Sequence, residues 1–188
     1  MLPYHLITSA EQLQDLLPRW RAAQILALDI EVAHAHQMRN RKQTVSLMQI
    51  WDGQSDHIWL LDALAVDTKP FIEEIMASKS VTKIFHDALH DLHTMKCVRR
   101  AQSVVCTLAM AKERLQPRCS LKALSANLLD LEIDKQYQMS NWATRPLSPE
   151  QLHYAALDAW VTYHVWCKLS QIPIPNPGIP VDPVPTSR

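Results

Sequence analysis

A helix whose first residue can be named from the sequence constrains the fold of this chain most strongly. Ser148 can cap the open N–H groups, Pro149 fits the first helical position, and Gln151 can complete a capping box. Tyr154 and Asp158 are four residues apart, so a phenol and a carboxylate share one edge of this helix. Alone, such a pair is more often a core aromatic and a solvated acid than a site. A core stripe recurs beside it at helical spacing: Leu152, Ala155, Ala156, Ala159, Tyr163 and Trp166.

Length and composition favour one domain. The 188 residues, 47% of them hydrophobic, suffice for one core and not for two. We expect a domain over residues 1–170 and a flexible tail over 171–188, which holds half of the twelve prolines. No apolar run reaches membrane length and the first residues lack a signal-peptide pattern, so we expect a soluble, cytoplasmic protein with no membrane partner. The four cysteines form no C-x-x-C pair, and we expect reduced thiols.

The charges of the chain cancel, with nineteen basic and nineteen acidic residues. This balance argues against a broad positive field that would hold nucleic acid. A phosphate partner would have to be contacted locally, for example through metal ions. An oligomer is compatible with the sequence, which does not indicate the oligomeric state.

Two acids lie at the end of the first long apolar run. The run Ile25–Val32 has the length of a strand, and on a strand Asp29 and Glu31 face the same side. Such close carboxylates raise each other's pKa unless a cation lies between them. Alone, the pattern is more often an edge residue followed by a loop residue than a site.

The order of predicted elements indicates an α/β fold. After the first strand, Val45–Trp51 and His57–Leu61 flank a turn at Asp52 and Gly53, which gives an antiparallel meander of three strands. Strands and helices then alternate, so we expect a mixed five-stranded sheet flanked by helices. Residues 81–85 and 103–106 are the remaining strands, and the helices cover 11–20, limited by Pro18 and capped by Thr8 and Glu11, then 69–77, 86–95, 107–115 and 120–129.

The predicted helix over 86–95 carries three histidines on one face, His86, His90 and His93, with Asp91 beside them. One interpretation is a metal hydrolase that binds zinc or iron through these histidines and neighbouring acids. The other is that Asp91 alone is functional and lies near the two acids of the first long strand. The second needs fewer coincidences, because H-D hydrolase domains are all-helical and the first half of this chain is rich in predicted strands.

Taken together, Asp29, Glu31, Asp91 and Asp158 form a set of four carboxylates, with Tyr154 one turn before the last. Four hard oxygen donors suit a pair of Mg²⁺ or Mn²⁺ ions. Two such ions can activate a water molecule and stabilise the leaving oxygen in phosphodiester hydrolysis.

At these residues the chain resembles the DEDD exonucleases of the tyrosine subtype, which have a ribonuclease H-like fold, and most closely the ribonuclease D type. LALDIEV, KIFHDALHDL and HYAALDA are similar to the three exonuclease motifs in order. The likeness covers residues 5–170 and includes a connector that matches the ribonuclease D pattern at Lys135, Ser140, Trp142, Arg145, Pro146 and Leu147.

The resemblance implies a 3′–5′ exonuclease that uses two divalent cations, Mg²⁺ or Mn²⁺, to hydrolyse single-stranded nucleic acid, RNA rather than DNA, to nucleoside 5′-monophosphates. Asp29 would bridge both metals, and Glu31 and Asp158 would complete one site. Asp91 would hold the other metal largely through waters. Tyr154 would orient the attacking water, since a phenol with a pKa near ~10 is a poor general base.

The chain departs from the family pattern at a few positions. Ile30 and Val32 replace a threonine and a phenylalanine or leucine, so substrate contacts there are expected to differ. Cys106 before Thr107 is similar to the nanoRNase C group, which degrades very short RNAs. We expect no appended helical RNA-binding domain, a rate that stops rising with substrate length after a handful of nucleotides, and weak salt dependence.

Some alternatives remain open. Short RNA, structured-RNA 3′ ends and single-stranded DNA are all candidate substrates. Lys135 and Arg145 are candidates either for phosphate contacts or for bracing the connector. A His/Asp metal phosphohydrolase and an inactive nucleic-acid-binding module are the alternative functions, and the intact carboxylate set weighs against the inactive module.

Overall fold

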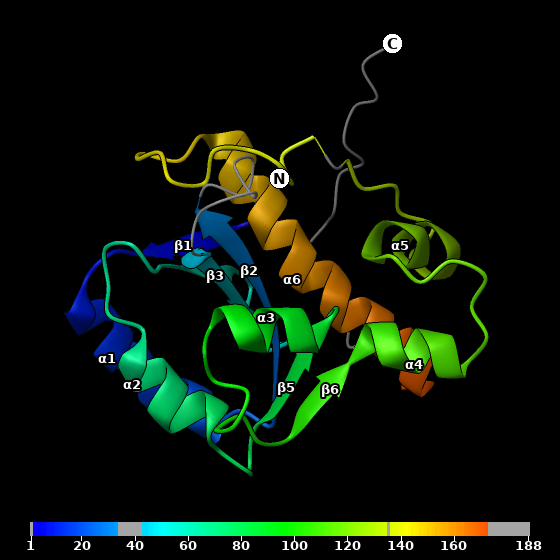
Figure 1. Cartoon of the computed structure of the whole chain (residues 1–188), viewed down its shortest axis with the longest axis horizontal. Coiled ribbons are helices and arrows are strands. Elements are labelled where there is room, and N and C mark those ends of the chain that lie inside the picture. The colour runs from blue at the N-terminus through cyan, green and yellow to red at the C-terminus, as the bar shows by residue number, and fades with distance from the viewer. Residues whose placement is uncertain (1, 34–42, 135, 173–188) are drawn as a thin grey trace.

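The computed structural model describes residues 2–33, 43–134 and 136–172, and within them the chain forms one mixed sheet with helices on both faces (Figure 1). The sheet has six strands in the order β1-β4-β3-β2-β5-β6. The predicted tail lies outside these residues except for its first two. The strands are β1 (Tyr4–Ile7), β2 (Ile25–Ala33), β3 (Thr44–Trp51), β4 (Ile58–Asp62), β5 (Thr82–Phe85) and β6 (Val104–Cys106).

The predicted α/β class and mixed sheet are confirmed, but the prediction of five strands is wrong. Strands β2, β3 and β4 form the antiparallel meander, and β5 and β6 add to β2 in parallel. The missed strand is β1, which pairs in parallel with β4 and aligns Tyr4 with Ile58. A four-residue strand whose partner is so distant in the chain carries no hairpin pattern that could reveal it.

The helices alternate with the later strands as expected. None of those in the described part of the chain has both the length and the hydropathy needed to cross a bilayer. They are α1 (Ala10–Ala22), α2 (Lys69–Phe71), which runs directly into the π-helix η2 (Ile72–Met76), α3 (Ala88–Thr94), α4 (Thr107–Glu113), α5 (Leu121–Leu129) and α6 (Pro149–Ser170).

Helix α6 begins where the sequence predicts. The Ser148 side chain accepts a hydrogen bond from the backbone N–H of Gln151 at 3.2 Å, and the Gln151 side chain accepts one from the N–H of Ser148 at 3.0 Å. This reciprocal capping box fixes the first turn, and therefore the angular position of every later side chain on the helix.

Helix α1 differs from the prediction at both ends. Its cap is Ser9 with Gln12, one residue later than predicted. It also continues through Pro18 to Ala22. The next turn carries Trp20, which is fully buried, and burial of this large side chain offsets the hydrogen bond that the proline removes.

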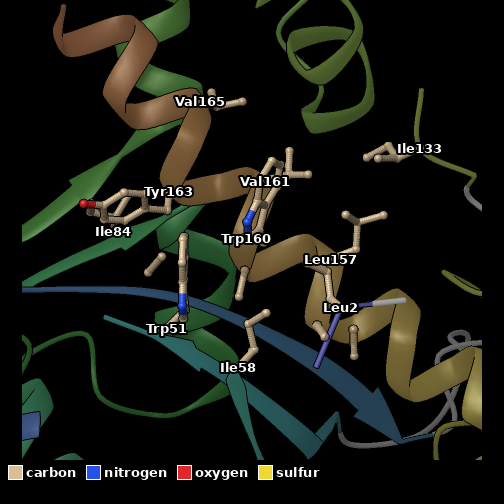
Figure 2. Close-up of a cluster of buried hydrophobic side chains, with 14 of the residues drawn as sticks. Leu2, Trp51, Ile58, Ile84, Ile133, Leu157, Trp160, Val161, Tyr163 and Val165 are labelled. Atoms are coloured by element: carbon tan, nitrogen blue, oxygen red, sulfur yellow. The ribbon is translucent and has the colours of Figure 1, made fainter. Parts of the chain in front are cut away.

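The two faces of the sheet carry separate hydrophobic cores. One core packs α1, η2 and α3 against the sheet. The other, drawn in Figure 2, packs α6 and the ends of α4 and α5 against it, with Trp51, Trp160 and Tyr163 at its centre. Helix α6 is buried along most of its length, which makes it the element around which the second core is built.

The turn after β3 fixes α6 onto the sheet. Gly53 has a φ of +74°, and a Cβ atom there would lie 2.3 Å from the ring of Tyr163. The same ring meets Trp51 edge-on, with centroids 5.0 Å apart. Only glycine allows this close approach, so the turn and α6 hold each other in place.

Candidate active site

Strand β2 directs Asp29 and Glu31 toward α6. The alternate residues of this strand, Leu26, Leu28 and Ile30, pack in the core on the opposite face. Successive side chains of a strand point to opposite faces, so the two acids project from the α6 side. The prediction that they share one face is therefore consistent with the packing of their neighbours.

Helix α6 supplies the matching groups. Tyr154 and Asp158 lie one turn apart on it, and the phenol donates a hydrogen bond to the carboxylate of Asp158. Asp158 is only 6% exposed, so it is not the solvated surface acid that an isolated Y-x-x-x-D would suggest. Its burial against the sheet places it opposite the acids of β2.

Three of the predicted carboxylates come together from these two elements. Each of Asp29, Glu31 and Asp158 offers an oxygen atom, and the three oxygen atoms lie within 4.8 Å of one another. Residues 127 positions apart along the chain therefore meet at one point, with a spacing that a single cation can bridge.

Asp91 lies beside this group rather than within it. It is on α3, which follows β5, and is 5% exposed. Its negative charge acts on Glu31, and that of Asp29 acts on it. One oxygen of its carboxyl group, Oδ2, is buried without a hydrogen-bond partner in the described part of the chain. A buried oxygen left in this state is costly unless a ligand compensates it.

Burial and mutual repulsion keep these acids from ionising. Burial raises the pKa of Asp29 to about 7. Burial, followed by the charge of Asp29, raises the pKa of Asp91 to about 9. Burial, then the charges of Asp29, Asp158 and Asp91, raise the pKa of Glu31 well above its usual range. Ionising these acids together is therefore unfavourable, and a bound cation would offset that cost.

The pKa of the Tyr154 phenol is raised by the same two causes, burial and neighbouring acids. Burial, followed by the charges of Asp158 and Glu31, raises its pKa above the ordinary value of 10. Tyr154 therefore keeps its proton at neutral pH, which suits a hydrogen-bond donor and not a general base.

The acids lie in a cleft of about 540 Å³. One wall comes from the start of α5, and another from the connector that precedes α6. The acids form a polar floor, and apolar side chains beside them offer surfaces on which a base can pack. The apolar residues that line the cleft include Val32, Leu108, Leu121, Ile133 and Met139.

The histidine interpretation is not supported. Helix α3 begins at Ala88, so His86 precedes the helix and the predicted row of three histidines on one helical face is wrong. The Nδ1 atom of His86 instead lies 2.9 Å from the hydroxyl of Thr107. His86 and His90 line the cleft, but the group of potential metal ligands found among the described residues contains no histidine.

Arg145 braces the connector. It donates to both carboxylate oxygens of Asp62, at 2.6 and 2.8 Å, and to the carbonyls of Trp142 and Thr144. These contacts favour bracing over phosphate binding for Arg145, and the sequence did not reveal Asp62 as its partner. Lys135 lies outside the described residues.

The residues fit divalent cations. Oxygen donors alone surround the point where Asp29, Glu31 and Asp158 meet, and these are the ligands that Mg²⁺ and Mn²⁺ prefer. Within residues 2–33, 43–134 and 136–172, no lysine or arginine forms an ion pair with Asp29, Glu31 or Asp91. A mixed sheet with such an acidic cleft is compatible with the class of metal-dependent hydrolases.

Comparisons with known proteins identify the family within this class. Residues 4–172 match the model of a family described as 3′–5′ exonuclease. The chain is 35% identical over 128 residues to ribonuclease D of Haemophilus influenzae, covering 64% of this chain and 31% of that protein. The chain therefore belongs to the 3′–5′ exonuclease family, and the predicted resemblance to ribonuclease D is confirmed.

Solved structures agree with this assignment. The structure of Escherichia coli ribonuclease D, an exoribonuclease involved in structured RNA processing, is 28% identical with a TM-score of 0.79, covering 89% of this chain and 44% of that one. Brucella melitensis NrnC is 26% identical with a TM-score of 0.69, covering 90% and 80% of the two chains. The ribonuclease H-like fold is confirmed, and the chain spans less than half the length of the ribonuclease D proteins compared.

Proposed function

We propose that this protein is a metal-dependent 3′–5′ exonuclease that removes nucleotides from single-stranded RNA. The observation that carries the proposal is the meeting of three carboxylates, the half-buried Asp29 and the buried Glu31 and Asp158, within 4.8 Å in a cleft. Family membership over residues 4–172 supports the same activity. RNA is favoured over DNA because Escherichia coli ribonuclease D, a related protein of the same fold, acts on RNA.

The carboxylates would hold two divalent cations, Mg²⁺ or Mn²⁺. Asp29, Glu31 and Asp158 would hold one of them, and Asp91, beside Asp29, would contribute to the second. When bound, these ions would activate the attacking water and stabilise the charge that develops on the leaving oxygen. The buried, mutually repelling acids are well suited to this role, since binding a cation removes the cost of their ionisation.

Tyr154 would position the attacking water. Its hydroxyl keeps its proton and is held by the hydrogen bond to Asp158, so it can orient a water molecule without accepting its proton. The oxygen of this water bonds to the terminal phosphorus while its proton passes to solvent, and the bond from phosphorus to the 3′ oxygen of the preceding nucleotide breaks as that oxygen takes up a proton from solvent. The products are a nucleoside 5′-monophosphate and a strand with a new 3′ hydroxyl.

The cleft would admit an unpaired 3′ end. Its acidic floor is flanked by apolar side chains such as Leu121 and Met139, on which a base can pack without being read by sequence. A paired end would have to open first, so a duplex 3′ terminus should be a poor substrate. The cytoplasmic location predicted from the sequence stays a prediction.

The test is hydrolysis of 5′-labelled single-stranded RNA and DNA of the same sequence, with Mg²⁺, Mn²⁺ or EDTA. We expect a ladder that shortens from the 3′ end, runs faster on RNA, and is absent in EDTA. Cleavage within the strand, degradation from the 5′ end, or hydrolysis undiminished by EDTA would contradict the proposal.

A further inference from the structure

The segment that joins α4 to α5 concentrates positive charge in a chain that is neutral overall. Residues 112–122, here called the basic rim, contain four basic residues and one acidic residue, Glu113. The chain as a whole has nineteen of each sign. All four cations are exposed: Lys112, Arg114, Arg118 and Lys122.

These four cations are not neutralised by neighbouring acids. In the described part of the chain, several other basic side chains pair with carboxylates, among them Arg19 with Asp52 and Arg21 with Glu74. No such ion pair involves any cation of the basic rim. The rim therefore presents its positive charge to solvent, where it can act on an approaching anion.

The basic rim is continuous with the cleft. Its last four residues, Cys119 to Lys122, line the cleft directly. Leu108 of α4 also lines it, and Lys112 lies one turn further along the same face of that helix. Figure 1 shows the loop running from the end of α4 back to the start of α5. The positive charge therefore begins at the cleft wall and extends outward from it.

The acidic floor and the basic rim suit successive parts of one RNA strand. The floor of the cleft carries acids and repels phosphates that have no cation beside them, whereas the rim attracts them. A strand whose 3′ end lies on the floor must pass its preceding phosphates out of the cleft over one of the walls. The wall at the start of α5 is the one that leads to the four unpaired cations.

We propose that the basic rim binds the backbone phosphates of the nucleotides that precede the 3′-terminal one. This inference rests on the proposed exonuclease function. Each cation that contacts a single strand contributes about 0.7 to the slope of log affinity against log salt, so Lys112, Arg114 and Arg118 together contribute about 2. Affinity then rises with the length of the RNA until the RNA spans the basic rim, and longer RNAs bind no more tightly. The salt dependence is therefore stronger than the neutral composition alone suggests.

The test compares RNA binding by a triple variant, Lys112→Gln, Arg114→Gln and Arg118→Gln, with that of the wild-type protein. Binding of a 5′-fluorescein 12-nucleotide RNA is measured by anisotropy in EDTA at several KCl concentrations. Kd should rise by at least about 10-fold and the salt slope should fall by about 2. The matched control is Lys79→Gln, which removes an exposed cation before β5, at the opposite end of the parallel strands, and should change Kd by less than about twofold.

The result that overturns the inference is a Kd and a salt slope in the triple variant equal to those of the wild-type protein. If the triple variant does not fold, as judged by circular dichroism, Arg114→Gln alone decides, with an expected slope change of about 0.7. The binding measurement needs no metal, so it is independent of catalysis. Absence of hydrolysis by the wild-type protein with Mn²⁺ would overturn the proposed function, and the rim would still be assigned or rejected by the anisotropy.

Discussion

Two groups of buried carboxylates in this protein have opposite electrostatic surroundings. Asp62, at the end of β4, is 4% exposed and accepts two hydrogen bonds from Arg145. Burial alone would raise its pKa, but the hydrogen bond and charge of Arg145 lower it below the usual 3.8. Glu31, at the end of β2, is 7% exposed, and burial together with neighbouring negative charges raises its pKa. Burial raises the pKa in both cases, but the neighbouring cation outweighs it at Asp62, whereas neighbouring anions add to it at Glu31.

The opposite pKa shifts distinguish a carboxylate that stabilises the fold from carboxylates that are suited to bind a ligand. The pair of Asp62 and Arg145 fixes the connector, which holds Trp142 with its ring 6.2 Å from that of Tyr154. In the part of the chain that the structure describes, Asp29, Glu31 and Asp91 form no ion pair with a lysine or arginine, and a bound cation would supply that compensation. Removing a charge should therefore have opposite consequences in the two groups.

The largest effect is expected on turnover when a cluster acid is neutralised. Asp29→Asn, Asp91→Asn and Asp158→Asn should each lower hydrolysis by about 10³-fold, because a ligand for the cations is lost. The thermal midpoint of the metal-free protein should not fall, since each change relieves repulsion. Turnover and midpoint are measured on the same preparations. Turnover close to wild type in any of the three would refute the assignment of that acid.

The second largest effect is expected on stability, when the ion pair between Asp62 and Arg145 is broken. Arg145→Met leaves the buried Asp62 without the cation that pairs with it and should lower the free energy of unfolding by about 3 kcal/mol, measured by chemical denaturation. The matched control is Arg100→Met, which breaks an exposed pair with Glu73 at 3.9 Å and should cost less than about 0.5 kcal/mol. Equal losses in the two variants would show that the buried pair does not brace the connector.

A smaller effect is expected at the phenol. Tyr154→Phe removes the hydroxyl that is bonded to Asp158 and should slow hydrolysis by at least about 10-fold through loss of water positioning. Tyr137→Phe is the matched control, because that ring neighbours Tyr154 at 6.2 Å but does not line the cleft.

The double variant His86→Ala and His90→Ala tests the alternative of a histidine-ligated hydrolase. We expect it to slow hydrolysis less than Tyr154→Phe does, because neither histidine belongs to the group of potential metal ligands. The reverse order, or activation by Zn²⁺ and inhibition by Mg²⁺, would favour a histidine-ligated hydrolase.

The smallest effect is on the pH dependence of stability without metal. The folded pKa values of Asp29 and Asp91, about 7 and about 9, exceed the unfolded value of 3.8. Their contribution to stability is therefore complete below about pH 4 and is lost as the pH rises through 7 and 9. In EDTA the thermal midpoint should fall by at least about 3 °C between pH 5 and pH 8, and Asp29→Asn should reduce this fall.

Asp62 should behave in the opposite way. Its folded pKa is below 3.8, so its contribution is present above that pH and is lost as the pH falls further. Asp62→Asn should therefore leave the fall between pH 5 and pH 8 as large as in the wild-type protein. A fall between pH 5 and pH 8 in Asp29→Asn as large as that of the wild-type protein would contradict the account of the cluster.

The sequence predicted the parts of the site that depend on local periodicity. A capping box fixes where α6 begins, so the spacing of Tyr154 and Asp158 on its surface followed from counting. The alternation of β2 likewise placed Asp29 and Glu31 on one face. Both predictions rest on patterns that span a few residues, which explains their success.

The parts that the sequence did not predict depend on distant or unusual contacts. Arg145 finds its partner Asp62 across 83 positions, which no local pattern indicates. His86 was expected on a helix, but Asp87 adopts a left-handed conformation with a φ of 62° and delays the start of α3. A non-glycine residue with positive φ is uncommon, and nothing in the neighbouring sequence demands it.

The central claim is that the clustered carboxylates bind divalent cations, and calorimetric titration of the metal-free protein with Mn²⁺ tests it most directly. Wild-type protein should bind Mn²⁺ saturably near pH 7.5 and release protons as it does so, because the cations displace protons from acids of raised pKa. The combined change Asp29→Asn and Asp158→Asn should abolish this binding, while Asp62→Asn should keep it. An isotherm for the Asp29 and Asp158 variant equal to that of the wild-type protein would contradict the account.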